Sequence, residues 1–151
     1  MSDAEKLRAL VVDDESGVRR VLIRALEQQG FQCDWAADGN AAEERAAHVQ
    51  YDAVVTDLRM PYTNGHALAM HLVTLKPRPV VVVHTGVIEP KIVKDLLARG
   101  VDDVLFKPCN LGLLAVKVKG IVERRSAEYS RIEPLLANTP DEMPAATDEE
   151  K

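Results

Sequence analysis

The sequence predicts an α/β fold built around a doubly wound, parallel, five-stranded sheet of the (βα)5 kind. Two observations support this prediction. Short β-branched runs alternate five times with helical patterns over the first 125 residues, and three of these runs are apolar almost throughout. Strands that are buried on both faces of a parallel sheet have that composition. In such sheets ligands bind beyond the carboxyl ends of the strands, so the residues there carry most of the functional information.

The expected elements follow one another in regular order. Five strands are predicted at residues 7–12, 32–35, 53–56, 80–84 and 104–106. Each strand is followed by apolar residues at helical spacing, which indicate amphipathic helices. These stripes lie within residues 18–26, 42–49, 65–72, 92–97 and 111–122.

The residues between these elements support the same boundaries. Gly30 and Gly100 each follow a helical stretch and suit the left-handed conformation that ends many helices. Asp38 precedes the second helix, where its carboxylate can cap free backbone N–H groups. Pro90 suits the first turn of the fourth helix, which needs no backbone N–H donor.

Length and charge indicate one domain with an acidic end. The chain has 151 residues and a net charge of −5, and residues 127–151 hold seven acids and two bases, so this segment carries the whole net charge. We therefore expect one domain at 1–126 and an acidic, disordered tail or linker at 127–151. Residues 126–136 could extend the last helix by a turn or two, although Pro134 opposes a long continuation. Without a basic surface, this chain is not expected to bind nucleic acid.

The remaining composition predicts a cytoplasmic protein. No apolar run reaches the roughly 18 residues that a membrane span needs, and the polar N-terminus is not a secretory signal. The two cysteines, Cys33 and Cys109, are far apart in the sequence and form no metal-binding motif. Isolated thiols fit a reducing compartment, and no membrane partner is expected.

Polar side chains gather where the predicted strands end. Asp13 and Asp14 follow the first strand, Asp57 follows the third, Thr85 follows the fourth, and Lys107 follows the fifth. Because the carboxyl ends of parallel strands share one edge, these three carboxylates, one hydroxyl and one ammonium should meet there.

This set of groups suits phosphoryl transfer with a hard cation. Three neighbouring carboxylates repel one another unless a cation sits among them, and an all-oxygen set favours Mg²⁺. A cation would allow Asp57 to act as a nucleophile toward phosphorus. Lys107 would bind one phosphoryl oxygen, and the hydroxyl of Thr85 would donate a hydrogen bond to another.

These residues resemble the receiver domain of bacterial two-component response regulators, a chemotaxis-regulator-like family. The resemblance spans about residues 7–125 and implies a flavodoxin-like fold with strand order 2-1-3-4-5. Each matching piece is weak alone, but together, at these spacings and at strand ends, they are specific. The pieces are Val11-Val12-Asp13-Asp14-Glu15, Val55-Thr56-Asp57-Leu58-Arg59-Met60-Pro61 with Gly65, His84-Thr85-Gly86, and Phe106-Lys107-Pro108.

The resemblance also implies roles for individual residues. Asp57 would be the phospho-acceptor, Asp14 would bind the metal directly, and Asp13 would assist through water. The backbone carbonyl of Arg59 would be a further metal ligand, and the Lys107–Pro108 peptide bond would be cis. The domain would catalyse its own phosphorylation and dephosphorylation without being a conventional enzyme.

The expected partners follow from the same resemblance. A sensor histidine kinase or a histidine phosphotransfer protein would donate the phosphoryl group, and the phosphorylated site would draw Thr85 inward. That movement would change a surface recognised by an unknown downstream protein, and a homodimer is also possible.

Some positions depart from the family pattern and leave alternatives open. Val104 stands where many receivers have an aromatic residue that rotates on activation, and Cys109 replaces another residue that is commonly aromatic. Arg59 and Val87 lie at positions that tune phosphoryl lifetime. One alternative is therefore a receiver-like dimerisation or scaffold module that is never phosphorylated, for which the apolar Val87 and Ile88 give a motive.

A small-molecule aspartyl phosphatase is disfavoured. Such enzymes use an Asp-x-Asp motif at the first strand, whereas Asp13 and Asp14 are adjacent here. The chain also has no insertion large enough to form a substrate cap. Dinucleotide binding is disfavoured too, because no glycine-rich fingerprint follows the first strand.

Overall fold

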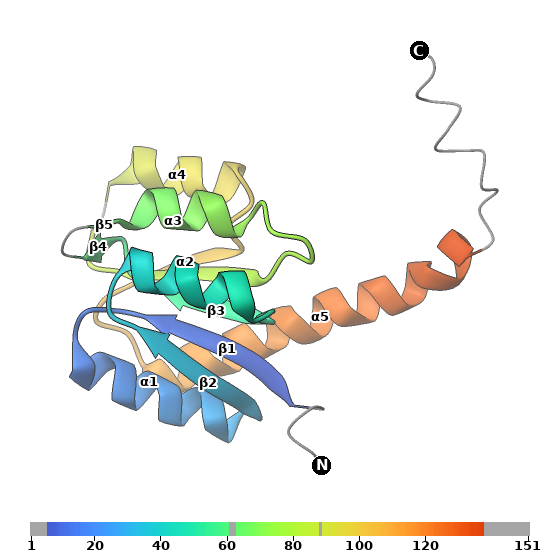
Figure 1. The fold of residues 1–151 in the computed structure, drawn as a ribbon, viewed down its shortest axis with the longest axis horizontal. Coiled ribbons are helices and arrows are strands. Elements are labelled where there is room, and N and C mark those ends of the chain that lie inside the picture. The colour runs from blue at the N-terminus through green and yellow to red at the C-terminus, as the bar shows by residue number, and fades with distance from the viewer. Residues whose placement is uncertain (1–5, 61–62, 88, 138–151) are drawn as a thin grey trace.

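The computed structural model describes residues 6–60, 63–87 and 89–137 and has the predicted architecture (Figure 1). Its main sheet has five parallel strands in the order β2-β1-β3-β6-β7. Counted along the chain, this is the order 2-1-3-4-5, so the predicted fold class is confirmed. The strands are β1 (Leu7–Val12), β2 (Phe31–Ala36), β3 (Ala53–Thr56), β6 (Val80–Thr85) and β7 (Asp103–Phe106).

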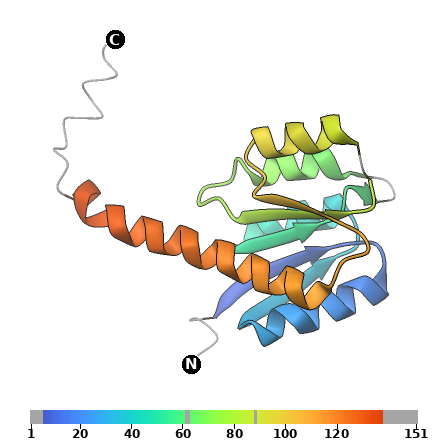
Figure 2. The same cartoon turned by 180° about the vertical axis from the view of Figure 1, so that it is seen from behind.

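Helices cover both faces of this sheet. One face packs against α1 (Ser16–Gln28) and α5 (Leu111–Ala137), which lie side by side in Figures 1 and 2. The other face packs against α2 (Gly39–His48), α3 (Gly65–Leu72) and α4 (Pro90–Ala98). This is the three-layer arrangement of a doubly wound α/β fold.

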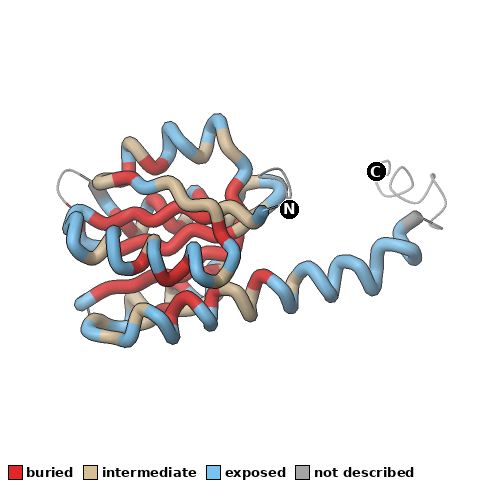
Figure 3. The backbone as a smooth tube through the Cα atoms, turned by 90° about the horizontal axis from the view of Figure 1, so that it is seen from below, coloured by how far each residue is buried: buried red, intermediate tan, exposed pale blue. Residues whose placement is uncertain are grey.

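The alternation of side chains along the strands creates a core on each face. In β1, Ala9 and Val11 pack toward α1 and α5, while Leu10 and Val12 pack toward α2, α3 and α4. All four are at most 1% exposed, and Figure 3 shows the strands as the buried centre of the molecule. Each fully buried Val or Leu side chain contributes about 1.5–3 kcal/mol. Burial on both faces explains why β1, β3 and β6 are apolar almost throughout.

The predicted helix boundaries are confirmed at four positions. Gly30 and Gly100 have φ angles of 96° and 113°, in the left-handed region that favours glycine. A carboxylate oxygen of Asp38 accepts a hydrogen bond of 2.8 Å from the backbone N–H of Ala41, as an N-cap does. Pro90 lies in the first turn of α4.

A small hairpin after β3 escaped the sequence analysis. It pairs β4 (Arg59–Met60) with β5 (Thr63–Asn64) in antiparallel register, and residues 61–62 between them lie outside the described residues. Two-residue strands are too short to show a period in the sequence. The hairpin positions the segment that follows Asp57.

The last helix is longer than expected. α5 continues to Ala137 with Pro134 inside it, and residues 126–136 are exposed (Figure 3). The expected disordered tail therefore begins with helix, and its remainder, 138–151, lies outside the described residues. Among the described residues, no helix has both the length and the apolar character that crossing a membrane requires.

Candidate functional site

Four strands bring polar side chains to one edge of the sheet. Asp13 follows β1, Asp57 follows β3, Lys107 follows β7, and Thr85 ends β6. Backbone hydrogen bonds extend the strand pairing to these residues, with Asp57 N donating to Val12 O at 3.0 Å and Lys107 N to Thr85 O at 2.8 Å. The sheet register therefore places residues from distant parts of the sequence next to one another.

Three carboxylates meet at this edge, as the sequence predicts. Asp13, Asp14 and Asp57 each offer one oxygen, and these oxygens lie within 4.8 Å of one another, a set that could hold a metal ion. Asp13 and Asp57 are only 3% and 5% exposed, whereas Asp14 is open to solvent. Two unit charges 4 Å apart repel by roughly 4 kcal/mol at an effective dielectric of 20. The cluster therefore favours the binding of positive charge.

Lys107 supplies positive charge next to the carboxylate cluster. Its Nζ lies 2.9 Å from Asp57 Oδ2, 3.0 Å from Asp13 Oδ2 and 3.6 Å from Glu15 Oε1. Burial alone would lower the pKa of Lys107, but the hydrogen bonds to Asp57 and Asp13 outweigh burial and raise it above the ordinary value. The lysine is therefore a permanent cation, and its peptide bond to Pro108 is cis, as predicted.

The second oxygen of Asp57 is held by the backbone. Asp57 Oδ1 accepts hydrogen bonds from the N–H groups of Leu58, at 2.7 Å, and Arg59, at 3.2 Å. Together with Lys107 on Oδ2, these donors fix the orientation of the carboxylate. Gly65 keeps this turn tight, because an added Cβ would lie 2.5 Å from the Leu58 backbone and 2.6 Å from Asp57 O.

The remaining predicted site residues are Thr85 and Arg59. Thr85 is fully buried at the end of β6, and its hydroxyl oxygen accepts a hydrogen bond of 3.1 Å from Val87 N. Arg59 is exposed, and its backbone N–H donates to Asp57. An open hollow of about 360 Å³ lies over the cluster, lined by Asp14, Glu15, Asp57, Arg59, Gly86, Val87 and Lys107. Thr85 lies beneath this surface and does not line the hollow.

Glu15 and His84 are two charged or polar neighbours that the sequence analysis did not assign to the site. Glu15 reaches Lys107, and only the run of acids after β1 could have indicated this. His84 is 4% exposed, and neither ring nitrogen has a hydrogen-bond partner among the described residues. Burial, and next the charge of Lys107, lower the pKa of His84 below its ordinary 6.5. Its ring is therefore neutral at pH 7.

We expect His84→Leu to stabilise the protein and to flatten its pH dependence. Leucine removes a buried imidazole that has no hydrogen-bond partner in the described part of the chain, so the free energy of unfolding should rise by about 1–3 kcal/mol. In the unmodified protein the unfolded chain takes up this proton at a higher pH than the folded protein does. Stability should therefore fall as the pH drops below 6.5, and less so in the variant. Thermal unfolding of both proteins at pH values above and below 6.5 measures both effects. An equally steep loss of stability in the variant would contradict the lowered pKa of His84.

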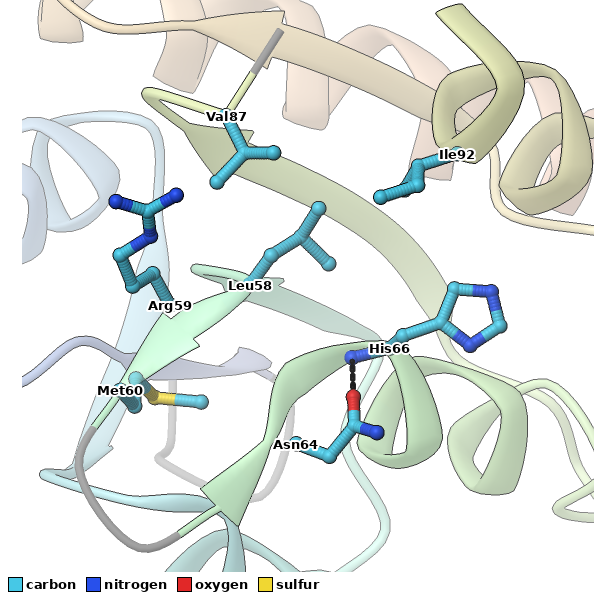
Figure 4. Close-up of a pocket in the computed structure, with 7 residues that line it drawn as sticks. All are labelled: Leu58, Arg59, Met60, Asn64, His66, Val87 and Ile92. Atoms are coloured by element: carbon cyan, nitrogen blue, oxygen red, sulfur yellow. Dashed lines mark hydrogen bonds between the residues drawn. The ribbon is translucent and has the colours of Figure 1, made fainter. Parts of the chain in front are cut away.

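A second hollow, of about 370 Å³, adjoins the site through Arg59 and Val87 (Figure 4). The side chains of Leu58, Val87 and Ile92 point into the space between the end of β3 and the start of α4. On its far side His66 Nε2 lies 2.8 Å from Asp95 Oδ2, which links α3 to α4. The pKa of Asp95 is lowered by its hydrogen bonds from Arg99 and then His66.

Comparisons with known proteins agree with this geometry. The family model described as the response regulator receiver domain matches residues 9–119. The transcriptional regulatory protein ResD of Bacillus subtilis is 31% identical over 140 residues, which cover 93% of this chain and 56% of ResD. The transcriptional regulatory protein PrrA of Mycobacterium tuberculosis is 35% identical over 141 residues, covering 88% of this chain and 60% of PrrA. The chain spans little more than half the length of these curated relatives.

Solved structures share the same fold. A CheY-like response regulator receiver domain protein from Methanospirillum hungatei superposes with a TM-score of 0.77 at 22% identity, covering 82% of this chain and 99% of that one. A two-component response regulator from Clostridium difficile superposes with a TM-score of 0.73 at 26% identity, covering 80% of this chain and 98% of that one. At 22% identity, the first likeness supports the fold alone. Both likenesses cover nearly the whole of the solved chains.

Proposed function

This chain belongs to the response regulator receiver domain family, and we propose that Asp57 is the residue through which it accepts a phosphoryl group. As a receiver it is a signalling module and not a conventional enzyme. The observation that carries the proposal is the setting of Asp57, which is 5% exposed, has Lys107 Nζ at 2.9 Å and has two further acids beside it. No other acid among the described residues belongs to such a three-carboxylate cluster.

We propose that the metal held by this cluster is Mg²⁺. The donors are all carboxylate oxygens, with no Cys or His in the set, and that chemistry suits a hard divalent ion. Asp14, which is exposed, would bind the ion directly, with Asp57 and the backbone carbonyl of Arg59, and Asp13 would assist through water. When bound, Mg²⁺ supplies positive charge that neutralises phosphoryl oxygens.

The chain's own residues would carry the transfer as follows. A carboxylate oxygen of Asp57 forms the new bond to phosphorus, and the bond from phosphorus to the donor nitrogen breaks. Lys107 moves from the carboxylate to a phosphoryl oxygen, which its flexible stem permits. Thr85 exchanges its hydrogen bond with Val87 N for one that its hydroxyl donates to the phosphoryl group, and this moves the loop that follows β6.

The same proposal extends to partners and domain limits. The donor would be a sensor histidine kinase or a histidine phosphotransfer protein, and the recipient of the signal would be a downstream protein or a second copy of the chain. The receiver unit would span 1–126, with 127–151 outside it.

Val104 is 8% exposed and packs in the core beside α4, so the output cannot depend on a rotating aromatic ring at this position.

Incubation with acetyl phosphate and Mg²⁺ tests the proposed function. We expect the intact mass to rise by one phosphoryl group and peptide mapping to locate it at Asp57. Chelation of Mg²⁺ should prevent the gain, because the carboxylate cluster then repels the anionic donor. A chain that folds and binds Mg²⁺ yet never gains the group would instead support the alternative of a non-phosphorylated scaffold.

A further inference from the structure

Arg19 links the acidic site to an exposed tryptophan on the neighbouring strand. Its Nη1 donates a hydrogen bond of 2.7 Å to the backbone carbonyl of Asp13. Its guanidinium carbon also lies 4.1 Å from the centroid of the Trp35 ring. Arg19 is the fourth residue of α1, and Trp35 is near the end of the edge strand β2. The arginine therefore bridges two elements beside the carboxylate cluster.

The carbonyl that Arg19 holds belongs to the peptide group joining Asp13 to Asp14. The peptide group is planar, so fixing this oxygen also fixes the backbone direction from which the Asp14 side chain leaves. Two further bonds order the same turn: Glu15 N donates to Asp13 Oδ1 at 2.9 Å, and Arg19 N donates to Glu15 O at 3.0 Å. Of these contacts, only the one from the guanidinium depends on a long and flexible side chain.

Trp35 is placed to hold that side chain still. Trp35 is 47% exposed, and its strand neighbours Asp34 and Ala36 pair with β1 beside the acidic turn. A guanidinium stacked on an indole face gains about 0.5–1 kcal/mol at such exposed sites and loses rotational freedom. The tryptophan thus favours the one arginine conformation that reaches Asp13 O.

We propose that Arg19 is a positioning residue for the metal site and that Trp35 positions Arg19. This inference rests on the proposed function, because it concerns the affinity of the cluster of Asp13, Asp14 and Asp57 for a cation. Residues that orient metal ligands from outside the coordination shell commonly change metal affinity by 10- to 100-fold when they are replaced. Because Trp35 acts one contact further away, its effect should lie at the lower end of that range.

Because Arg19 is charged, replacing it would change Mg²⁺ affinity in two opposite ways. A guanidinium close to the carboxylates opposes cation binding, so its removal would tighten Mg²⁺ binding by charge alone while loosening the geometry. Trp35→Leu avoids this conflict, because it alters no charge and removes only the aromatic face. Trp35→Phe keeps an aromatic face and serves as the conservative rescue. Arg20 is the adjacent exposed arginine on α1, so Arg20→Met is the matched control for the loss of one positive charge.

The experiment measures Mg²⁺ affinity by calorimetry and stability by thermal unfolding with Mg²⁺ chelated. We expect Trp35→Leu to weaken Mg²⁺ binding about tenfold with little loss of stability, and Trp35→Phe to restore most of the affinity. In an Arg19→Met background Trp35→Leu should have no further effect. Unchanged affinity in Trp35→Leu, or the same loss with and without Arg19, would overturn the proposal.

Two outcomes separate this inference from the proposed function. If the unmodified protein binds Mg²⁺ and is phosphorylated by acetyl phosphate while Trp35→Leu behaves identically, only the role of Arg19 and Trp35 is wrong. If the unmodified protein does not bind Mg²⁺, the metal assignment fails first and this inference fails with it. A loss in Trp35→Leu that matches a loss of folded protein would also count against positioning.

Discussion

Asp57→Asn should abolish phosphorylation of the chain by acetyl phosphate while leaving the fold intact. An amide has neither the negative charge nor the free oxygen nucleophile that attack on phosphorus requires. Its carbonyl oxygen can still accept the hydrogen bonds that Asp57 Oδ1 receives from Leu58 N and Arg59 N, so the turn should keep its shape. Lys107 would retain Asp13 and Glu15 as partners.

Intact mass after incubation with acetyl phosphate and Mg²⁺ measures this effect, and circular dichroism checks the fold. Asp103→Asn is the control, because Asp103 begins β7 at the other end of the strand and pairs with Lys117 at 2.8 Å. That variant should be labelled like the unmodified protein. Persistent labelling of Asp57→Asn on Asp13 or Asp14 would show that the acceptor is misassigned.

The position of the site could be predicted because it depends on the ends of strands. Asp13, Asp57 and Lys107 are 44 and 50 residues apart in sequence, yet each directly follows an apolar run that had to be a strand. Parallel strands bring their carboxyl ends to one edge, so no knowledge of side-chain contacts was needed. The structure confirms that these side chains meet, whereas their individual roles remain predictions.

Other features depend on three-dimensional contacts for which the sequence carries no signal. Arg19 meets Trp35 only because α1 packs beside β2 at one particular rotation. His84 continues the apolar run of β6, so its burial follows from the strand. That its ring has no hydrogen-bond partner within the described ranges depends on every side chain around it. Helix propensity argues against Pro134, yet the structure carries α5 past it, near the helix end where few hydrogen bonds remain to be lost.

Lys107→Ala should slow phosphorylation by roughly a hundredfold without weakening Mg²⁺ binding. The ammonium is proposed to bind a phosphoryl oxygen during transfer, and removing one such preorganised donor typically has an effect of that size. In the resting protein, however, the same ammonium occupies oxygens of Asp13 and Asp57, at 3.0 and 2.9 Å. It therefore competes with a cation for the cluster, and its loss should make Mg²⁺ binding tighter.

The stability of this variant should show the same competition. With Mg²⁺ chelated, two carboxylates that are 3% and 5% exposed lose their cationic partner, which should destabilise the protein by about 3–5 kcal/mol. Saturating Mg²⁺ should restore most of that loss, because a cation again neutralises the cluster. Lys117→Ala is the control, since Lys117 is half-exposed and pairs with Asp103 away from the site. Weaker Mg²⁺ binding in Lys107→Ala would mean that the lysine supports the metal site instead of competing with it.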